Sequence, residues 1–154
     1  MSSAAEQLAA LGLTLPPVTA PVAAYVPAVR TGSYVYVSGQ LPVVDGKLPA
    51  TGKVGDAVSA QDAAGLARIC ALNALAAAAE AAGGLDAIVR IVKVLGFVAS
   101  APGFNGQPQV VNGASELLIE VFGEAGRHAR SAVGVAELPL DAPVEVELIA
   151  EVRA

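Results

Sequence analysis

An alanine-rich stretch between residues 59 and 82 constrains the fold more than any other feature of the sequence. Ser59 is followed three residues later by Asp62, a pattern typical of a helix N-terminus with a capping hydroxyl and an acidic first turn. The alanines and leucines that follow have high helix propensity, and Gly83 with Gly84 ends the pattern. Apolar side chains that recur at helical spacing are expected to face a sheet: Leu66, Ile69, Leu72 and Leu75.

Segments rich in valine lie on both sides of this helix and predict strands. We expect, in chain order, a hairpin with arms 25–30 and 34–38, the helix 59–82, a central strand 87–99, a loop 100–109, a second helix at about 108–123, and strands 129–137 and 144–152. The order is therefore two strands, helix, strand, helix, two strands. This order predicts an α+β fold in which a sheet of mixed direction carries both helices on one face.

The first twenty residues are predicted to be an extension of a single domain that spans residues 1–154. Residues 3–12 suit a short helix with Ser2 or Ser3 as its cap. Prolines at positions 16, 17 and 21 then interrupt regular structure and indicate a linker. A chain of 154 residues is long enough to bury one core without disulfides or metals.

The composition limits the classes of function. Apolar residues make up 55% of the chain and charged residues 15%, so part of the surface is expected to be hidden in subunit contacts. The net charge of −5 and the absence of a Lys/Arg cluster disfavour nucleic acid as a partner. Because there is no basic leader and no uncharged apolar run of membrane-spanning length, neither secretion nor a membrane partner is expected. One cysteine and one histidine predict no disulfide and no metal site, and a reducing cytoplasm fits best.

The predicted strand 129–137 carries Arg130, a candidate binding residue. Because side chains alternate between the faces of a strand, Arg130 shares its face with Ala132, Gly134 and Ala136. These small residues leave space beside the guanidinium, which would suit a pocket for an anion. The same pattern also fits a helix that approaches the strand closely, with Arg130 in a structural ion pair.

The last predicted strand places Glu145 and Glu147 on one face, roughly 7 Å apart by strand geometry. Two carboxylates at this spacing repel each other unless a cation compensates, and one of them would then be free to hold a water molecule. The alternative is an ordinary solvated strand face. His128 lies two residues before Arg130 and is either a proton donor on the same face or a capping or surface residue. Cys70 lies in the alanine-rich helix and is expected to be a small core residue.

Three blocks of the sequence together resemble the Rid (YjgF-like) family. They are the stretch YVPAVRTG from Tyr25 leading to SGQLP at 38–42, the helix from Asn112 to VFG at 121–123, and ARSAVGVAELP at 129–139 followed by VEVELIA at 144–150. The resemblance covers nearly the whole chain from about residue 20. It implies a chorismate-mutase-like (bacillus-type) fold and a homotrimer with one active site at each subunit interface. Active members of the family hydrolyse 2-imino acids to 2-oxo acids and ammonia, without a cofactor or a metal.

The resemblance also implies roles for particular residues. Arg130 would clamp the substrate carboxylate, a task that suits a planar guanidinium. Glu145 would position the attacking water, helped by a backbone carbonyl near Gly39. Tyr25 and Asn112 match the tyrosine and the helix asparagine of the family's site. The chain resembles a longer subgroup, because it has a long loop at 100–110, an extra N-terminal helix, Ala132 where many members have cysteine, and His128 near a frequent proline.

Two other functions remain open at the level of sequence. The same site could hold a small carboxylate metabolite without turnover, as part of a regulatory or interaction module. Some relatives carry the label endoribonuclease, which the acidic charge and the missing basic patch disfavour.

Overall fold

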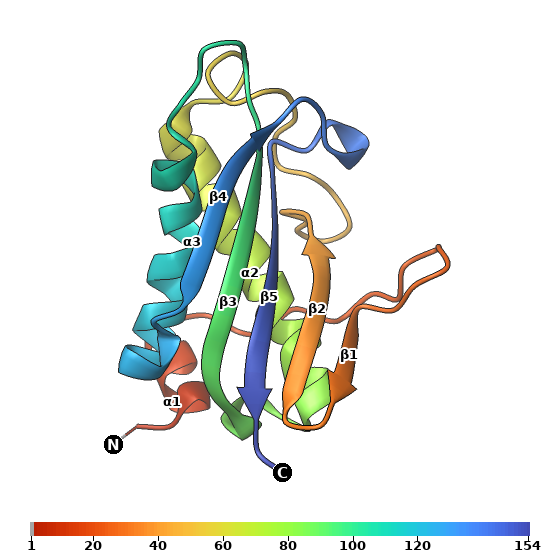
Figure 1. Ribbon diagram of the computed structural model, residues 1–154, viewed down its shortest axis with the longest axis vertical. Coiled ribbons are helices and arrows are strands. Elements are labelled where there is room, and N and C mark those ends of the chain that lie inside the picture. Colours follow the sequence, from red (N-terminus) through yellow and green to blue (C-terminus); the bar gives the residue numbers. More distant parts are fainter. Residues whose placement is uncertain (1) are drawn as a thin grey trace.

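Five strands form one mixed sheet, and two long helices cover one of its faces (Figure 1). The computed structural model describes residues 2–154. The elements are α1 Ala4–Ala10, β1 Ala28–Thr31, β2 Tyr34–Gln40, α2 Ala60–Ala82, β3 Ile88–Ala99, α3 Gln107–Phe122, β4 Ala129–Val135 and β5 Val144–Val152, with 3₁₀ turns η1 Leu85–Ala87, η2 Gly123–Gly126 and η3 Pro139–Asp141. The predicted α+β fold, with its mixed sheet and both long helices on one face, is confirmed.

The strand order across the sheet is β1-β2-β5-β3-β4. β5 lies in the centre and is antiparallel to both β2 and β3. β4 is an edge strand that pairs with β3 alone, in parallel, because α3 carries the chain back along the sheet between them. The last helix and the edge strand are therefore packed side by side, a placement that matters for the site below.

Local sequence signals set the ends of the helices. The Ser59 hydroxyl accepts a hydrogen bond from the Asp62 backbone N–H at 3.0 Å, as the sequence predicts for the start of α2. Gly83 ends α2 in the left-handed region with φ 90°, which a residue with a Cβ adopts only with strain. Ser3 and Glu6 form a reciprocal capping box at α1, so Ser3 is the cap.

The core lies between the sheet and the helices. Burial alternates along β5, where Val144, Val146, Leu148, Ala150 and Val152 point toward the helices. On α2, Leu66 and Leu75 are buried as predicted, whereas Ile69 and Leu72 are only partly buried at the margin of the core. Much of the buried side of α2 consists of alanine together with Cys70, which confirms the core position of that cysteine. Small side chains let the helix approach the sheet closely.

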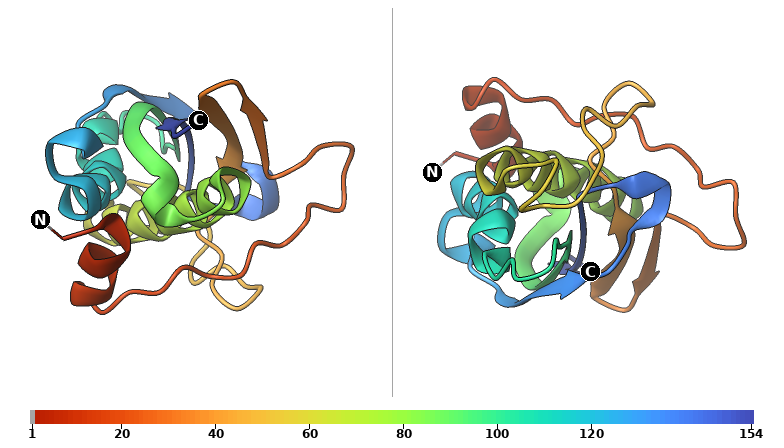
Figure 2. Two further views of the ribbon diagram at one scale, coloured as in Figure 1. Left: turned by 90° about the horizontal axis from the view of Figure 1, so that it is seen from below. Right: turned by 90° about the horizontal axis from the view of Figure 1, so that it is seen from above.

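α2 is long and apolar enough to cross a membrane by length and composition alone. In this fold 61% of an apolar 18-residue stretch of α2 is buried within the protein, as is usual for a core helix. The end-on views in Figure 2 show α2 between the sheet and the N-terminal segment.

Some predicted boundaries are wrong. Residues 25–27 do not belong to the hairpin, because β1 begins at Ala28. They form the root of an arm, which projects beyond β1 after the N-terminal segment has crossed the outer side of α2 (Figures 1 and 2). β4 ends at Val135, two residues before the predicted end, where the chain bends toward η3. The start of β1 has no strong local signal, since valine and tyrosine continue through the arm.

A glycine makes the close contact between the two long helices possible. A Cβ on Gly113 of α3 would collide with the backbone carbonyl of Ala64 in α2. Gly65, the next residue of α2, is exposed and has open space where a Cβ would be. The two glycines therefore form a matched pair, in which one is required by packing and the other is not.

Gly113→Ala is expected to reduce the free energy of unfolding by about 1–3 kcal/mol, because α2 and α3 must move apart. Gly65→Ala is expected to raise it by up to about 1 kcal/mol, because alanine favours a helix. Urea denaturation of both variants at one protein concentration measures the difference. Equal effects of the two substitutions would contradict the packing described here.

Candidate functional site

Arg130 reaches from the edge strand β4 to the neighbouring helix α3. Its Nη1 donates to Oδ1 of Asn112 at 2.7 Å and to Oγ of Ser115 at 3.2 Å. Its Nη2 makes a longer contact of 3.4 Å with the carbonyl of Pro108 in the first turn of α3. The predicted pair of Arg130 and Asn112 is thus brought together. Asn112 and Ser115 are three residues apart on the helix and therefore share a face.

Every oxygen atom in this set is neutral. Arg130 takes part in none of the ion pairs formed among residues 2–154, which join Lys53 to Glu137, Arg68 to Glu120 and Arg127 to Glu124. The structural ion pair that the sequence left open for Arg130 is therefore not formed in this chain. Its half-buried guanidinium keeps a positive charge that no carboxylate of the described residues neutralises.

The small residues beside Arg130 accommodate the start of α3. A Cβ on Gly134 would come within 2.9 Å of Nε2 of Gln107 and 3.0 Å of Oγ of Ser100. Ala132 packs against the core. The open floor that the sequence suggested on this side of the strand is therefore occupied by the helix, and the guanidinium lies along that helix.

His128 and Ser115 form a second layer behind Arg130. His128 Nδ1 lies 2.6 Å from the carbonyl of Gly126, and Nε2 lies 2.9 Å from Oγ of Ser115. Burial lowers the pKa of His128 most strongly, the Gly126 carbonyl opposes that effect, and the charge of Arg130 lowers the pKa further. The ring is therefore neutral near pH 7. Because a carbonyl only accepts, Nδ1 carries the proton and Nε2 accepts from the Ser115 hydroxyl.

Sequence reasoning missed Ser115. It is the one buried polar residue among residues 2–154, with 8% of its surface exposed, and it lies among apolar neighbours on α3. A serine inside a helix usually bonds its own backbone or points to solvent. The available signal was its position three residues after Asn112, a spacing that places both polar groups on one face.

The second group of predicted residues gathers where β2 and β5 meet. Val37 pairs with Leu148 and Gln40 with Val146, so Ser38 and Gly39 together lie opposite the single residue Glu147. This is a β-bulge, which disrupts the ladder and changes the direction of nearby side chains. A Cβ on Gly39 would collide with Oε1 of Glu145 and lie 2.8 Å from its Cδ. The predicted neighbours Gly39 and Glu145 are thus in contact, and only glycine leaves room for the carboxylate.

The environment makes Glu145 a stronger base than an exposed glutamate. Glu145 is half-buried, and burial raises the pKa of its carboxyl group; the like charge of Glu147 on the same strand face raises it further. Neither residue takes part in the ion pairs of residues 2–154. The compensating arginine that the sequence analysis considered is therefore not supplied by this chain in its own fold.

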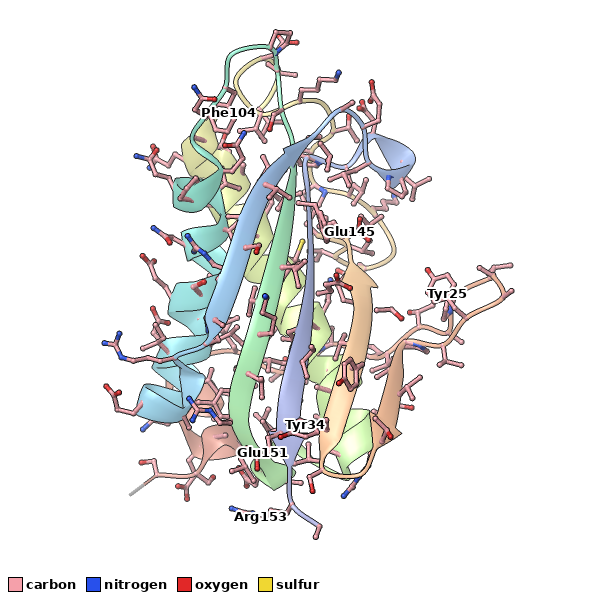
Figure 3. The ribbon with its side chains drawn as sticks, in the orientation of Figure 1. Tyr25, Tyr34, Phe104, Glu145, Glu151 and Arg153 are labelled. Carbon is pink, nitrogen blue, oxygen red and sulfur yellow. The ribbon has the colours of Figure 1, made fainter. Side chains whose placement is uncertain are left out.

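Tyr25 lies on the projecting arm, with 56% of its surface exposed (Figure 3). The root of the arm is fixed to the bulge, because Ser38 Oγ donates to the carbonyl of Val26 at 2.6 Å and the Ser38 N–H donates to Pro27 at 2.8 Å. The tyrosine itself lies beyond β1, at the edge of the sheet opposite to β4.

The two groups lie on opposite faces of the sheet. Arg130 is the register partner of Val94, whose side chain is fully buried beneath the helices, and parallel neighbours share a face. Glu145 alternates with buried Val144 and Val146, so it points to the face that the helices leave open. β3 lies between their strands. One chain therefore cannot bring Arg130 and Glu145 to the same small ligand.

The helix-free face carries exposed apolar side chains around the glutamates of the central strand β5. Tyr36 of β2, Leu95 of β3, and Glu147 and Ile149 of β5 line a hollow of about 180 Å³. The aromatic and aliphatic residues Val29, Tyr34, Tyr36 and Val133 are each more than two-fifths exposed. An exposed apolar face of this kind usually marks a contact with another molecule. Among residues 2–154 no group of three or more His, Cys, Asp or Glu side chains is placed to hold a metal ion.

Comparison with known proteins identifies the family. The family described as "YjgF/chorismate_mutase-like, putative endoribonuclease" matches residues 5–152. The chain belongs to the YjgF/chorismate mutase-like family. The matched span includes most of the N-terminal segment, from within α1 onward.

Two relatives with similar sequences have names that differ in content, since one name states a reaction and the other does not. The chain is 45% identical over 150 residues to Protein TCP17 of Trypanosoma cruzi, which covers 97% of this chain and 94% of that protein. It is 37% identical over 131 residues to a 2-iminobutanoate/2-iminopropanoate deaminase of Salmonella typhimurium, covering 85% and 89% of the two chains. The relative whose name states a reaction is thus similar to this chain along most of its length.

Solved structures agree with the fold. Protein Atu1372 of Agrobacterium tumefaciens, described as of unknown function, is 46% identical with a TM-score of 0.90, covering 99% of this chain and 94% of its own. The protein TdcF of E. coli, solved with bound serine, is 31% identical with a TM-score of 0.64, covering 88% and 92%. The YjgF-like fold is therefore shared with a protein described as of unknown function and with a protein solved with a small bound ligand.

Glu147→Gln is expected to lower the pKa of Glu145 toward its ordinary value, because the like charge is removed; burial remains and keeps the pKa above that value. A ¹³C NMR titration of the carboxyl groups measures the shift. Glu151→Gln, farther along the same face of β5, is the control and should leave Glu145 unchanged. A shift with the control, or none with Glu147→Gln, would contradict the described coupling.

Proposed function

We propose that the protein hydrolyses small 2-imino acids and their enamine tautomers to 2-oxo acids and ammonia. The observation that carries the proposal is the guanidinium of Arg130, which α3 holds through neutral oxygen atoms and whose charge remains available for a ligand carboxylate. The similarity to the Salmonella deaminase supports the reaction, and the serine bound to TdcF supports a small carboxylate ligand.

The proposed reaction needs one clamp and one water-holding base. Arg130 binds the carboxylate of the imino acid and fixes the position of the adjacent imine carbon. Glu145, ionised and partly desolvated, accepts a proton as the water oxygen bonds to that carbon. The proton passes to nitrogen and gives a carbinolamine. As its carbon–nitrogen bond breaks, the hydroxyl becomes the carbonyl of the 2-oxo acid and its proton passes to the departing nitrogen, which leaves as ammonia. In the proposal the Gly39 backbone helps to hold the water, and Tyr25 covers the ligand from the arm.

We further propose that the active form is a homotrimer in which Arg130 of one subunit faces Glu145 of the next. Two observations support a site shared between chains. The two residues lie on opposite faces of the sheet within one chain, and the face that carries Glu145 is uncovered and bears exposed apolar side chains. A rotation that brings the β4–α3 edge of one subunit onto the open face of its neighbour would cover that face and complete the site.

A second function is favoured by one specific observation. The polar set around Arg130 comes entirely from α3 and β4, so a carboxylate could bind there without the base. The alternative is therefore a non-catalytic module that binds a small carboxylate and passes the signal to a partner. Binding of 2-oxobutanoate without any turnover of imines would favour this alternative over the deaminase.

Arg130→Ala is expected to lower kcat/KM for 2-iminobutanoate by about 100-fold or more, because two charge-assisted hydrogen bonds to the carboxylate are lost. Arg130→Lys keeps the charge but not the planar fork and is expected to lose about tenfold. Arg127→Ala, which removes an exposed surface ion pair, is the matched control and should behave as wild type. Ammonia release above the spontaneous rate is the measurement. Wild type without any acceleration would contradict the proposed reaction.

Mixing two inactive variants tests whether the site is shared. Glu145→Gln is expected to abolish turnover while keeping carboxylate binding, and to fold at least as stably near neutral pH, because an ionised group with a raised pKa opposes folding there. When Arg130→Ala and Glu145→Gln chains are unfolded together and refolded, random assembly leaves about a quarter of the interfaces with both intact residues. We expect about a quarter of wild-type activity. No recovery, or a monomeric mass by light scattering, would contradict the shared site.

A further inference from the structure

We propose that Ser115 and His128 are positioning residues that set the direction of the Arg130 guanidinium. The inference rests on the proposed role of Arg130 as the carboxylate clamp and extends it to two residues that do not themselves contact the ligand. Three contacts form a continuous path: the Gly126 carbonyl to His128 Nδ1 at 2.6 Å, His128 Nε2 to Ser115 Oγ at 2.9 Å, and Ser115 Oγ to Arg130 Nη1 at 3.2 Å.

The direction of each hydrogen bond in this path is fixed by chemistry. The carbonyl of Gly126 has no proton to give, so Nδ1 of His128 must donate to it. In a neutral ring the other nitrogen then has a lone pair, and the Ser115 hydroxyl donates to it. With its proton used in this way, the Ser115 oxygen presents a lone pair to Arg130, which can only donate.

Without His128, the hydroxyl of Ser115 would be free to rotate. Ser115 is buried, and its rotor would then turn its proton toward a backbone carbonyl or toward the guanidinium itself. His128 removes this freedom because it offers an acceptor in one direction only. Its lowered pKa keeps the ring neutral near pH 7, which preserves that acceptor.

Arg130 needs such support because of its position in the sheet. β4 is an edge strand that pairs with β3 alone, and a long arginine side chain loses considerable rotamer freedom when it is fixed. Asn112 accepts a hydrogen bond from Nη1 at 2.7 Å, and Ser115 accepts one from the same nitrogen at 3.2 Å. These two acceptors use both N–H groups of Nη1, and the Pro108 carbonyl lies 3.4 Å from Nη2, so Nε–H and the second N–H of Nη2 are left to meet a carboxylate in two-point contact.

Two substitutions of His128 separate positioning from packing. In His128→Gln the side-chain oxygen can reach the place of Nε2 and accept from Ser115, whereas in His128→Asn the shorter amide reaches only the place of Nδ1. We expect both His128→Asn and Ser115→Ala to weaken binding of the product 2-oxobutanoate about tenfold. Both variants are also expected to raise KM more than they lower kcat. Gln is expected to remain within about twofold of wild type, since the acceptor is restored.

A double-variant cycle and one spectroscopic measurement complete the test. Ser115→Ala combined with His128→Asn is expected to be no worse than Ser115→Ala alone, because both act through one hydroxyl. The chain has a single histidine, so ¹⁵N NMR of labelled histidine reports this ring alone. We expect the proton on Nδ1 near pH 7 and a shifted Nε2 signal in Ser115→Ala.

The outcomes distinguish this inference from the proposed function. If Arg130→Ala abolishes 2-oxobutanoate binding while Gln and Asn at position 128 behave alike, the positioning role is wrong and the clamp stands. A proton on Nε2, or full additivity in the double variant, would also overturn it. If Arg130→Ala leaves binding unchanged, the proposed function itself fails. Thermal melting of each variant shows whether a loss reflects unfolding, and the Gln variant keeps the test decisive if the Asn variant does not fold.

Discussion

A positive charge held by neutral oxygen atoms is the constraint on which the rest of this structure depends. The amide of Asn112, the hydroxyl of Ser115 and a backbone carbonyl of α3 orient Arg130 without cancelling its charge. A carboxylate in their place would have made the arginine a structural element. Neutral acceptors instead satisfy its hydrogen bonds on one side and leave its electrostatic attraction for a ligand, which is more effective where water is partly excluded.

The topology explains why Arg130 and Glu145 are separated. α3 must return the chain along the sheet so that β4 can run parallel to β3, and the helix therefore covers the face on which Arg130 lies. The central strand β5 alternates buried valines with Glu145 and Glu147, which places both carboxylates on the other face. The uncovered face also carries exposed apolar side chains from β1, β2 and β4. The same alternation that builds the core thus creates the surface that a second subunit would cover.

Much of the fold could be predicted because its signals are local. The cap at Ser59, the stop at Gly83 and the alternation in 144–152 each depend on neighbours within a few residues. The site was only partly accessible to such reasoning. The bulge at Ser38–Gly39 depends on pairing with a strand more than a hundred residues later, and nothing local shows it. Likewise, Ser115 looks unremarkable on its helix until the register of β4 brings His128 and Arg130 beside it.

The dependence of Arg130 on a helix has a consequence for how relatives of this protein diverge. The loop from Ser100 to Gly106 sets where α3 starts, and Gln107 and Ser100 lie against Gly134 at that point. An insertion or deletion that moved the start of α3 would slide the helix along the edge strand. Such a slide moves the two side chains that aim the guanidinium while every functional residue type is preserved. Relatives with identical site residues therefore need not share a ligand, because the length of this loop is a separate variable that acts on the position of the guanidinium.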